Sequence, residues 1–237
     1  MSNNKIVFLE FNGIPGSGKT TLSNSVIENQ SGMDFVVESY QQVIEKPTRK
    51  NLKQLVKYLI HVKLSSFRMG CLGMMYLLTN RKFNRKNWLR IVAIIILYDF
   101  YQKKSIEQSE EVILVDQGIV QQIVSISYET ELLSDWFVRK MITRIKKKEL
   151  NLYIVNVDLD VTESFDRLNR RVGNISRIQK MNREQGIETL KTQQNNFNII
   201  REIITKTGIA SIDINTHERI EENVRLLKDF IMKIKSS

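Results

Sequence analysis

The chain has 237 residues, of which 42% are hydrophobic and 26% charged, a balance that excludes intrinsic disorder and fits one globular domain. Its single cysteine, Cys71, excludes an intramolecular disulfide, and its longest apolar run, Ile91 to Tyr98, is far too short to span a membrane. The net charge of +10 is uneven, because residues 46–104 contain 14 Lys or Arg and one acid, Asp99, which indicates either a phosphate-bearing partner or a solvated helical face.

The N-terminal third of the chain begins with a strand pattern. Residues 5–11 form a mostly apolar run that predicts a buried parallel strand, and a glycine-rich turn and a helix over 19–29 follow it. A second short strand is predicted over residues 34–38. Apolar positions then recur at helical spacing, so residues 51–104 are predicted to be mainly helical.

The rest of the chain alternates strands with helices. Strands are predicted over residues 112–115, 152–157 and 209–213. Helices are predicted over residues 119–127, 135–148, 184–206 and 217–235. This alternation predicts a three-layer α/β domain, with a parallel sheet of about five strands flanked by helices and with residues 46–104 as a basic helical insertion.

One further helix is predicted after the strand that ends at residue 157. Asp160 can cap its N-terminus, and Glu163, three residues later, is expected to reach back as in a capping box. Gly173-Asn174 is expected to end this helix.

The strongest motif is Gly13-Ile14-Pro15-Gly16-Ser17-Gly18-Lys19-Thr20, a full match to the P-loop pattern G-x-x-x-x-G-K-[ST] between a strand and a helix. Glycines let consecutive backbone N–H groups curl around phosphates, and the following helix adds its positive end. Lys19 is expected to reach the β- and γ-phosphates, and the Thr20 hydroxyl to bind Mg²⁺. The predicted cofactors are therefore ATP and Mg²⁺, with ATP held by Gly13, Pro15, Gly16, Ser17, Gly18, Lys19, Thr20 and Thr21.

Other motifs narrow the class of P-loop protein. The sequence has no Asn-Lys-x-Asp motif, which disfavours a GTPase, and no Leu-Ser-Gly-Gly-Gln signature, which excludes a transporter ATPase. A short chain whose P-loop lies near residue 13 favours a small-molecule kinase.

Four spaced features resemble the thymidylate kinase and deoxynucleoside kinase group of P-loop kinases. They are Phe11-Asn12-Gly13 leading into the P-loop, Glu38 after the second strand, the run Ile113 to Gly118, and the arginine-bearing segment Glu163 to Arg171. Together they cover most of the chain except residues 46–104. The resemblance implies a P-loop kinase fold and transfer of the γ-phosphoryl group of ATP to a nucleoside or nucleoside monophosphate.

The resemblance also implies residue roles. Glu38 stands where deoxynucleoside kinases place the carboxylate that takes the proton from the acceptor hydroxyl, so we expect it to be catalytic. Asn12 and Gln117 depart from the group, which often has Glu and Arg at these positions. Since that Arg helps to hold the acceptor, the group indicates the chemistry better than the substrate.

An aspartate and four arginines complete the candidate site. Asp116 directly follows an apolar strand and is expected to hold Mg²⁺ with Thr20. Arg167 and Arg171 are expected to neutralise charge during transfer, next to Lys19. The remaining two, Arg170 and Arg177, are expected to bind nucleotide in a lid over about residues 167–183. We expect about two of the four arginines to touch nucleotide.

Several alternatives stay open. The acceptor could instead be a sugar or a lipid-linked saccharide, and the protein could instead be a non-catalytic ATP-binding switch. Nucleic acid is not expected as a partner, whereas a homodimer stays open. Peripheral contact with an anionic membrane is a further hypothesis, in which Arg81, Lys82, Arg85 and Lys86 bind the lipid surface. The N-terminus lacks the features of a signal peptide, so we expect a cytoplasmic protein.

Overall fold

The apolar runs predicted as strands form one parallel sheet in the computed structural model, which describes residues 6–28, 35–37, 59–107, 111–126, 133–148, 150–173 and 176–236. In spatial order the strands are β2 (Phe35–Val37), β3 (Val112–Val115), β1 (Val7–Asn12), β4 (Leu152–Asp158) and β5 (Ser211–Asn215). All four neighbouring pairs run parallel. The predicted parallel sheet of about five strands is confirmed.

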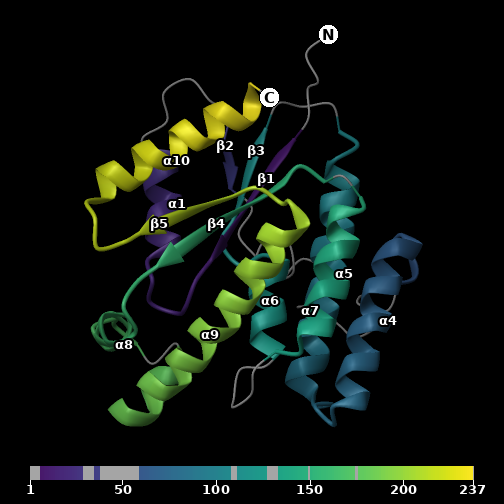
Figure 1. The fold of residues 1–237 in the computed structure, drawn as a ribbon, viewed down its shortest axis with the longest axis horizontal. Coiled ribbons are helices and arrows are strands. Elements are labelled where there is room, and N and C mark those ends of the chain that lie inside the picture. Colours follow the sequence, from purple (N-terminus) through teal and green to yellow (C-terminus); the bar gives the residue numbers. More distant parts are fainter. Residues whose placement is uncertain are drawn as a thin grey trace.

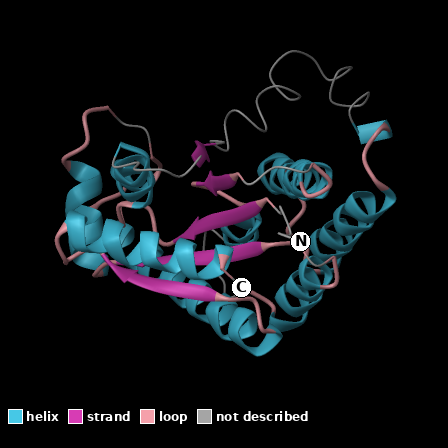
Figure 2. Cartoon of the chain, turned by 90° about the horizontal axis from the view of Figure 1, so that it is seen from above, coloured by secondary structure: helices cyan, strands magenta, loops and turns pink. Residues whose placement is uncertain are grey.

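Helices cover both faces of this sheet (Figures 1 and 2). On one face lie α1 (Lys19–Glu28) and α10 (Ile220–Lys235). On the other lie α4 (Leu64–Thr79), α5 (Arg85–Lys104), α6 (Ile119–Ile126), α7 (Asp135–Lys146), α8 (Val161–Asn169) and α9 (Arg183–Thr207). The three-layer α/β fold expected from the sequence is therefore present.

Successive residues of each strand point to opposite layers, so the sheet separates two hydrophobic cores. Phe8 and Ile113 belong to the core under α4–α9. Their neighbours Leu9 and Leu114 belong to the core under α1 and α10. Because both faces are buried, the strands are continuous apolar runs rather than alternating ones, as is usual in parallel sheets.

The segment predicted as an insertion supplies part of the main core. α5 lies directly on the sheet, where the ring of Tyr101 is 4.7 Å from the ring of Phe8. α4 packs on α5 at Gly70, where an added methyl group would lie 2.3 Å from Ile95. The described residues from 59 to 104 are mainly helical, as the apolar spacing predicted, and α5 belongs to the helical layer on this face of the sheet. Residues 46–58 lie outside the described residues.

The outward side of α4 is apolar. Its exposed large hydrophobic side chains are Leu64, Phe67, Met75 and Leu78, and Ile60, four residues before the helix, is exposed as well. Cys71 is exposed on the same helix. In the described part of the chain, no helix is both long enough and apolar enough to cross a membrane.

Several strand boundaries differ from the predictions by one or two residues, and the start of β5 is an example. β5 begins at Ser211, two residues later than expected. Gly208 ends α9 in the left-handed conformation with a φ of 71°, and Ile209 N donates to Ile204 O at 3.3 Å. Ile209 thus closes the end of α9 before the strand can start.

The strand order places a ligand site at the end of β1. β1 and β4 are neighbours, but the chain leaves β1 toward β2 at one edge and leaves β4 toward β5 at the other. In open parallel sheets, ligands bind in the crevice outside the carboxyl ends of the strands at such a switch point. The loop over residues 13–18 lies at this position.

Candidate functional site

Backbone geometry explains the glycines of this loop. Gly16 and Gly18 have φ values of 91° and 95°, a region that side chains with a Cβ rarely adopt. At Gly16 a Cβ would also lie 2.5 Å from the carbonyl oxygen of Ser164. A bulkier residue would therefore strain the loop and push it away from α8.

Two hydroxyl groups from distant parts of the chain hold the loop. Ser164 Oγ, on α8, donates to Pro15 O at 2.5 Å. Thr216 Oγ1, just after β5, donates to Ser17 O at 2.9 Å. Sequence reasoning missed both residues, because a single Ser or Thr outside any motif carries no signal of its own.

Lys19 lies against the inner surface of the loop. Its Nζ donates to Gly13 O at 2.7 Å and to Ile14 O at 3.0 Å. Burial lowers the pKa of Lys19 to about 7, while the neighbouring Asp116 raises this pKa and Arg171 lowers it further. A nearby anion, such as the oxygens of a phosphate group, would stabilise the charged form of Lys19 that burial disfavours.

The loop presents hydrogen-bond donors that suit a chain of phosphates. α1 begins at Lys19, so the N–H groups of its first turn have no partner within the helix and point toward the loop. Ser17 is fully buried, and its Oγ has no hydrogen-bond partner among the described residues. These open donors match the oxygens of a bound phosphate chain.

Asp116 meets Lys19 because their strands are neighbours. β1 and β3 run parallel in register, with Glu10 opposite Val115, so the residues that follow them lie at the same edge of the sheet. Within the described residues, no cluster of three or more His, Cys, Asp or Glu could hold a metal ion. Mg²⁺ usually takes few protein ligands and keeps phosphate oxygens and water, so Thr20 and Asp116 would suffice as its protein ligands.

A buried carboxylate positions the turn that carries Asp116. Glu10 lies within β1, fully buried, and accepts hydrogen bonds from Ile119 N at 2.7 Å, Val120 N at 3.1 Å and the hydroxyl of Tyr101 at 2.7 Å. Burial raises the pKa of Glu10, although these three donors lower it. Glu10 thus ties α5 and the start of α6 to the P-loop strand. Sequence reasoning missed it, although a carboxylate inside an apolar strand is a recognisable signal.

We expect Glu10→Ala to lower the free energy of unfolding by about 3 kcal/mol, because the change leaves buried donors of α6 and Tyr101 without an acceptor. Urea unfolding followed by circular dichroism measures this loss. Glu10→Gln keeps the shape of the side chain and should lower the free energy of unfolding by less. Since the pKa of Glu10 is raised above its ordinary value of 4.5 in the fold, the wild type should lose stability relative to Glu10→Gln as the pH rises above 4.5. An Ala variant as stable as the wild type would contradict this role.

Asp160 caps the N-terminus of α8, whereas Glu163 takes no part in a capping box. Asp160 Oδ1 accepts from Thr162 N at 2.8 Å and from Glu163 N at 3.1 Å, as the sequence predicted. The Glu163 side chain does not reach back to the cap. Its Oε1 accepts from Arg167 at 2.7 Å, and its Oε2 lies 2.9 Å from His217 Nδ1. The capping-box prediction is wrong at Glu163, because two basic groups compete for that carboxylate.

The four candidate arginines separate into two pairs. Arg171 and Arg177 line the cavity at the P-loop. Arg167 does not line it, since its guanidinium bonds to Glu163 and, at 3.0 Å, to Thr216 O. Arg170 is exposed outside the cavity lining. The helix ends at Asn169, earlier than predicted. In the turn that follows, the side chain of Arg171 lines the cavity and that of Arg170 does not.

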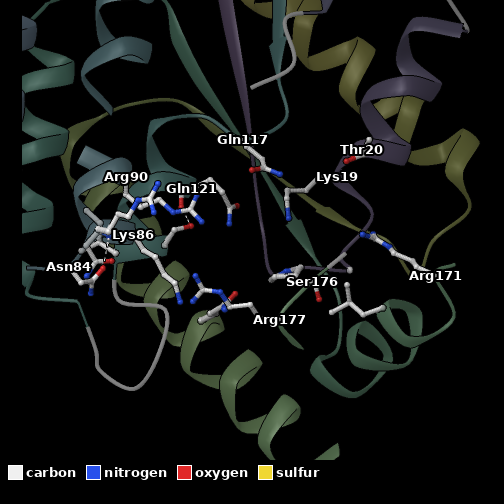
Figure 3. Close-up of a pocket in the computed structure, with 18 of the residues that line it drawn as sticks. Lys19, Thr20, Asn84, Lys86, Arg90, Gln117, Gln121, Arg171, Ser176 and Arg177 are labelled. Carbon is white, nitrogen blue, oxygen red and sulfur yellow. Dashed lines mark hydrogen bonds between the residues drawn. The ribbon is translucent and has the colours of Figure 1, made fainter. Parts of the chain in front are cut away.

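The cavity has a volume of about 900 Å³ and lies between the P-loop, the start of α5, α6, and the segment after α8 (Figure 3). Pro15, Gly16, Gly18, Lys19 and Thr20 form its P-loop side, whereas Thr21 does not line it. A second side, which we call the basic wall, consists of Lys82, Arg85, Lys86 and Arg90. Three of the four residues considered for membrane contact thus line this cavity. Glu38, the expected general base, lies outside the described residues, so its role stays a prediction.

Comparison with known proteins adds a likeness of fold. No protein-family model and no curated relative matches the chain. A solved structure that matches is that of deoxyadenosine kinase from M. mycoides with bound dATP, with a TM-score of 0.48 and 12% sequence identity over 95% of this chain and 99% of that chain. The functional assignment therefore depends on the geometry of this chain's own P-loop and cavity.

Proposed function

We propose that the protein is an ATP-dependent phosphotransferase that moves the γ-phosphoryl group of ATP to a hydroxyl of a small acceptor. The observation that carries this proposal is the shape of the cavity. At one side Lys19, Thr20 and Arg171 surround the mouth of the P-loop, and the same space extends to the basic wall. A volume of about 900 Å³ leaves room for a second small molecule beside a nucleotide.

Each step of the transfer has a group to support it. The acceptor oxygen bonds to the γ-phosphorus, the bond from this phosphorus to the β-phosphate oxygen breaks, and ADP leaves with the electron pair. The hydroxyl proton is released, and Glu38 as its acceptor is a hypothesis. Negative charge on the transferring group is neutralised by Lys19 and Arg171, while Mg²⁺ held by Thr20 and Asp116 would neutralise charge between the phosphates.

The segment after α8 offers a matched pair of variants. Arg171→Gln removes a cation that lines the cavity, whereas Arg170→Gln removes an exposed cation next to it. We expect Arg171→Gln to lower kcat about 100-fold and Arg170→Gln to leave it near the wild-type value. Formation of phosphorylated product and of ADP, measured over a panel of nucleosides, nucleoside monophosphates, sugars and sugar phosphates, gives both the acceptor and the rates.

Acceptor dependence decides between the kinase and the ATP-binding switch. A kinase forms ADP and phosphorylated acceptor in equal amounts. Hydrolysis of ATP at the same rate with and without every acceptor, and with no phosphorylated product, would contradict the proposal. Equal losses for Arg171→Gln and Arg170→Gln would contradict the placement of Arg171 at the transferring group.

A further inference from the structure

The first turn of α5 presents cations where a helix disfavours them. Asn84 caps the helix, its Oδ1 accepting from Asn87 N at 2.9 Å, and Arg85 and Lys86 follow in a turn without an acid. The N-terminal end of a helix carries partial positive charge, so basic residues there destabilise it unless an anion lies near. Arg85 and Lys86 are exposed toward the cavity, and no ion pair in the described part of the chain neutralises them.

The rest of the cavity does not supply the missing negative charge. Arg90 is oriented by a hydrogen bond from its Nη1 to Gln122 Oε1 at 2.9 Å. Lys86 and Arg177 point into the same cavity from opposite sides (Figure 3). Among the described residues that line the cavity there is no Asp or Glu. Phosphates of ATP would account for the charge at the P-loop, but the basic wall belongs to a different side and calls for a second anion.

Two amide side chains in the cavity lack hydrogen-bond partners in the described part of the chain. Gln193, on α9, lines the cavity and is only 1% exposed, yet its Nε2 has no partner among the described residues. Gln121, on α6, lines the same space, and its Oε1 is likewise unpaired. A buried donor and a buried acceptor without partners are costly unless a ligand completes their hydrogen bonds. The described lining contains no Phe, Tyr or Trp on which a planar base could stack.

We infer that the acceptor is a phosphate ester of a hydroxyl-rich molecule, the chemistry of a sugar phosphate. Its phosphate binds to Arg85, Lys86 and Arg90, where the N-terminal end of α5 adds its partial charge. Its hydroxyl groups pair with Gln121 and Gln193, since a hydroxyl can both donate and accept. This inference rests on the proposed kinase function, and it names the substrate class and the residues that select it.

Calorimetry on the full chain tests binding separately from turnover. The P-loop is first saturated with Mg²⁺ and adenylyl imidodiphosphate, an ATP analogue that is not transferred. Ribose phosphate, ribose, thymidine monophosphate and thymidine are then titrated as probes. Arg85→Gln/Lys86→Gln tests the basic wall. Arg219→Gln/Arg225→Gln, two exposed positions at α10 away from the cavity, is the control with the same change of charge.

We expect ribose phosphate to bind at least about tenfold more tightly than ribose, and the wall variant to lose at least about tenfold in this affinity. Affinity for the ATP analogue should stay within about twofold of the wild-type value in both variants. Added salt should lower the affinity for ribose phosphate. Gln193→Leu, which removes the unpaired amide, should lower the affinity for ribose phosphate. The ratio of the affinities for ribose phosphate and ribose should stay the same.

Other outcomes are decisive. If the wall variant binds the ATP analogue more weakly and binds ribose phosphate as the wild type does, the basic wall belongs to the nucleotide site and the inference fails. Preferential binding of thymidine monophosphate overturns the hydroxyl-rich acceptor, and equal binding of ribose and ribose phosphate overturns the phosphate site. Wall-dependent binding of ribose phosphate without transfer to any acceptor supports the site and contradicts the proposed kinase function, so the two can fail separately.

Discussion

Lys19→Ala should lower the rate of phosphoryl transfer by about three orders of magnitude, equivalent to about 4 kcal/mol of transition-state stabilisation. Lys19 is the cation at the end of the loop, and among the described residues its Nζ bonds to the backbone carbonyls of Gly13 and Ile14. When a phosphate chain occupies the loop, this ammonium can neutralise negative charge on the γ-phosphoryl group during its transfer. Initial rates of ADP and product formation measure the loss.

The fold should survive this change. Burial opposes the charge of Lys19 and lowers its pKa to about 7, so removing the ammonium also removes a charge that the fold disfavours. The melting temperature of Lys19→Ala is therefore expected to stay close to that of the wild type. Lys191→Ala, at an exposed position of α9, controls for the loss of a surface lysine. Turnover of ATP by Lys19→Ala at the wild-type rate would show that the P-loop assignment is wrong.

Local sequence patterns predicted the sheet and the P-loop well. An apolar run such as Val112–Val115 is buried on both faces and becomes a strand with little help from the rest of the chain. The P-loop is similarly local, since its glycines and Lys19 act through the backbone of one short loop. The register of β1 and β3 then follows, and it brings Asp116 close enough to Lys19 to raise the pKa of Lys19.

Long-range contacts account for what the sequence did not predict. The sequence did not predict which face of α5 covers β1, where the hydroxyl of Tyr101 donates to Glu10 at 2.7 Å. The sequence also did not predict that Arg171 lines the cavity while Arg167 does not. This difference depends on where α8 ends and on the bond between Arg167 and Glu163. The basic wall is a third example. Its charge was visible in the sequence, but only the packing of α5 beside α6 turns it toward the P-loop.

Asp116→Asn should lower kcat by about 100-fold or more and shift the Mg²⁺ dependence of the remaining activity to higher concentrations. The change keeps the size of the side chain and removes a negative charge from the end of β3, where Thr20 and Asp116 would hold the ion. Mg²⁺ prefers anionic oxygen ligands and usually takes few of them from the protein, so losing one charge should weaken binding of the metal–nucleotide complex.

A magnesium titration of the steady-state rate separates this role from a general loss of activity. In Asp116→Asn the half-saturating Mg²⁺ concentration should rise, whereas in Lys19→Ala it should stay near the wild-type value while the rate falls. Asp229→Asn, an exposed aspartate of α10, controls for the change in net charge. Glu10 holds the turn that carries Asp116, so Glu10→Gln should shift the same titration in the same direction but by less. An unchanged Mg²⁺ titration for Asp116→Asn would move the metal site away from β3, because no loss of charge at a true ligand could leave the metal requirement as it was.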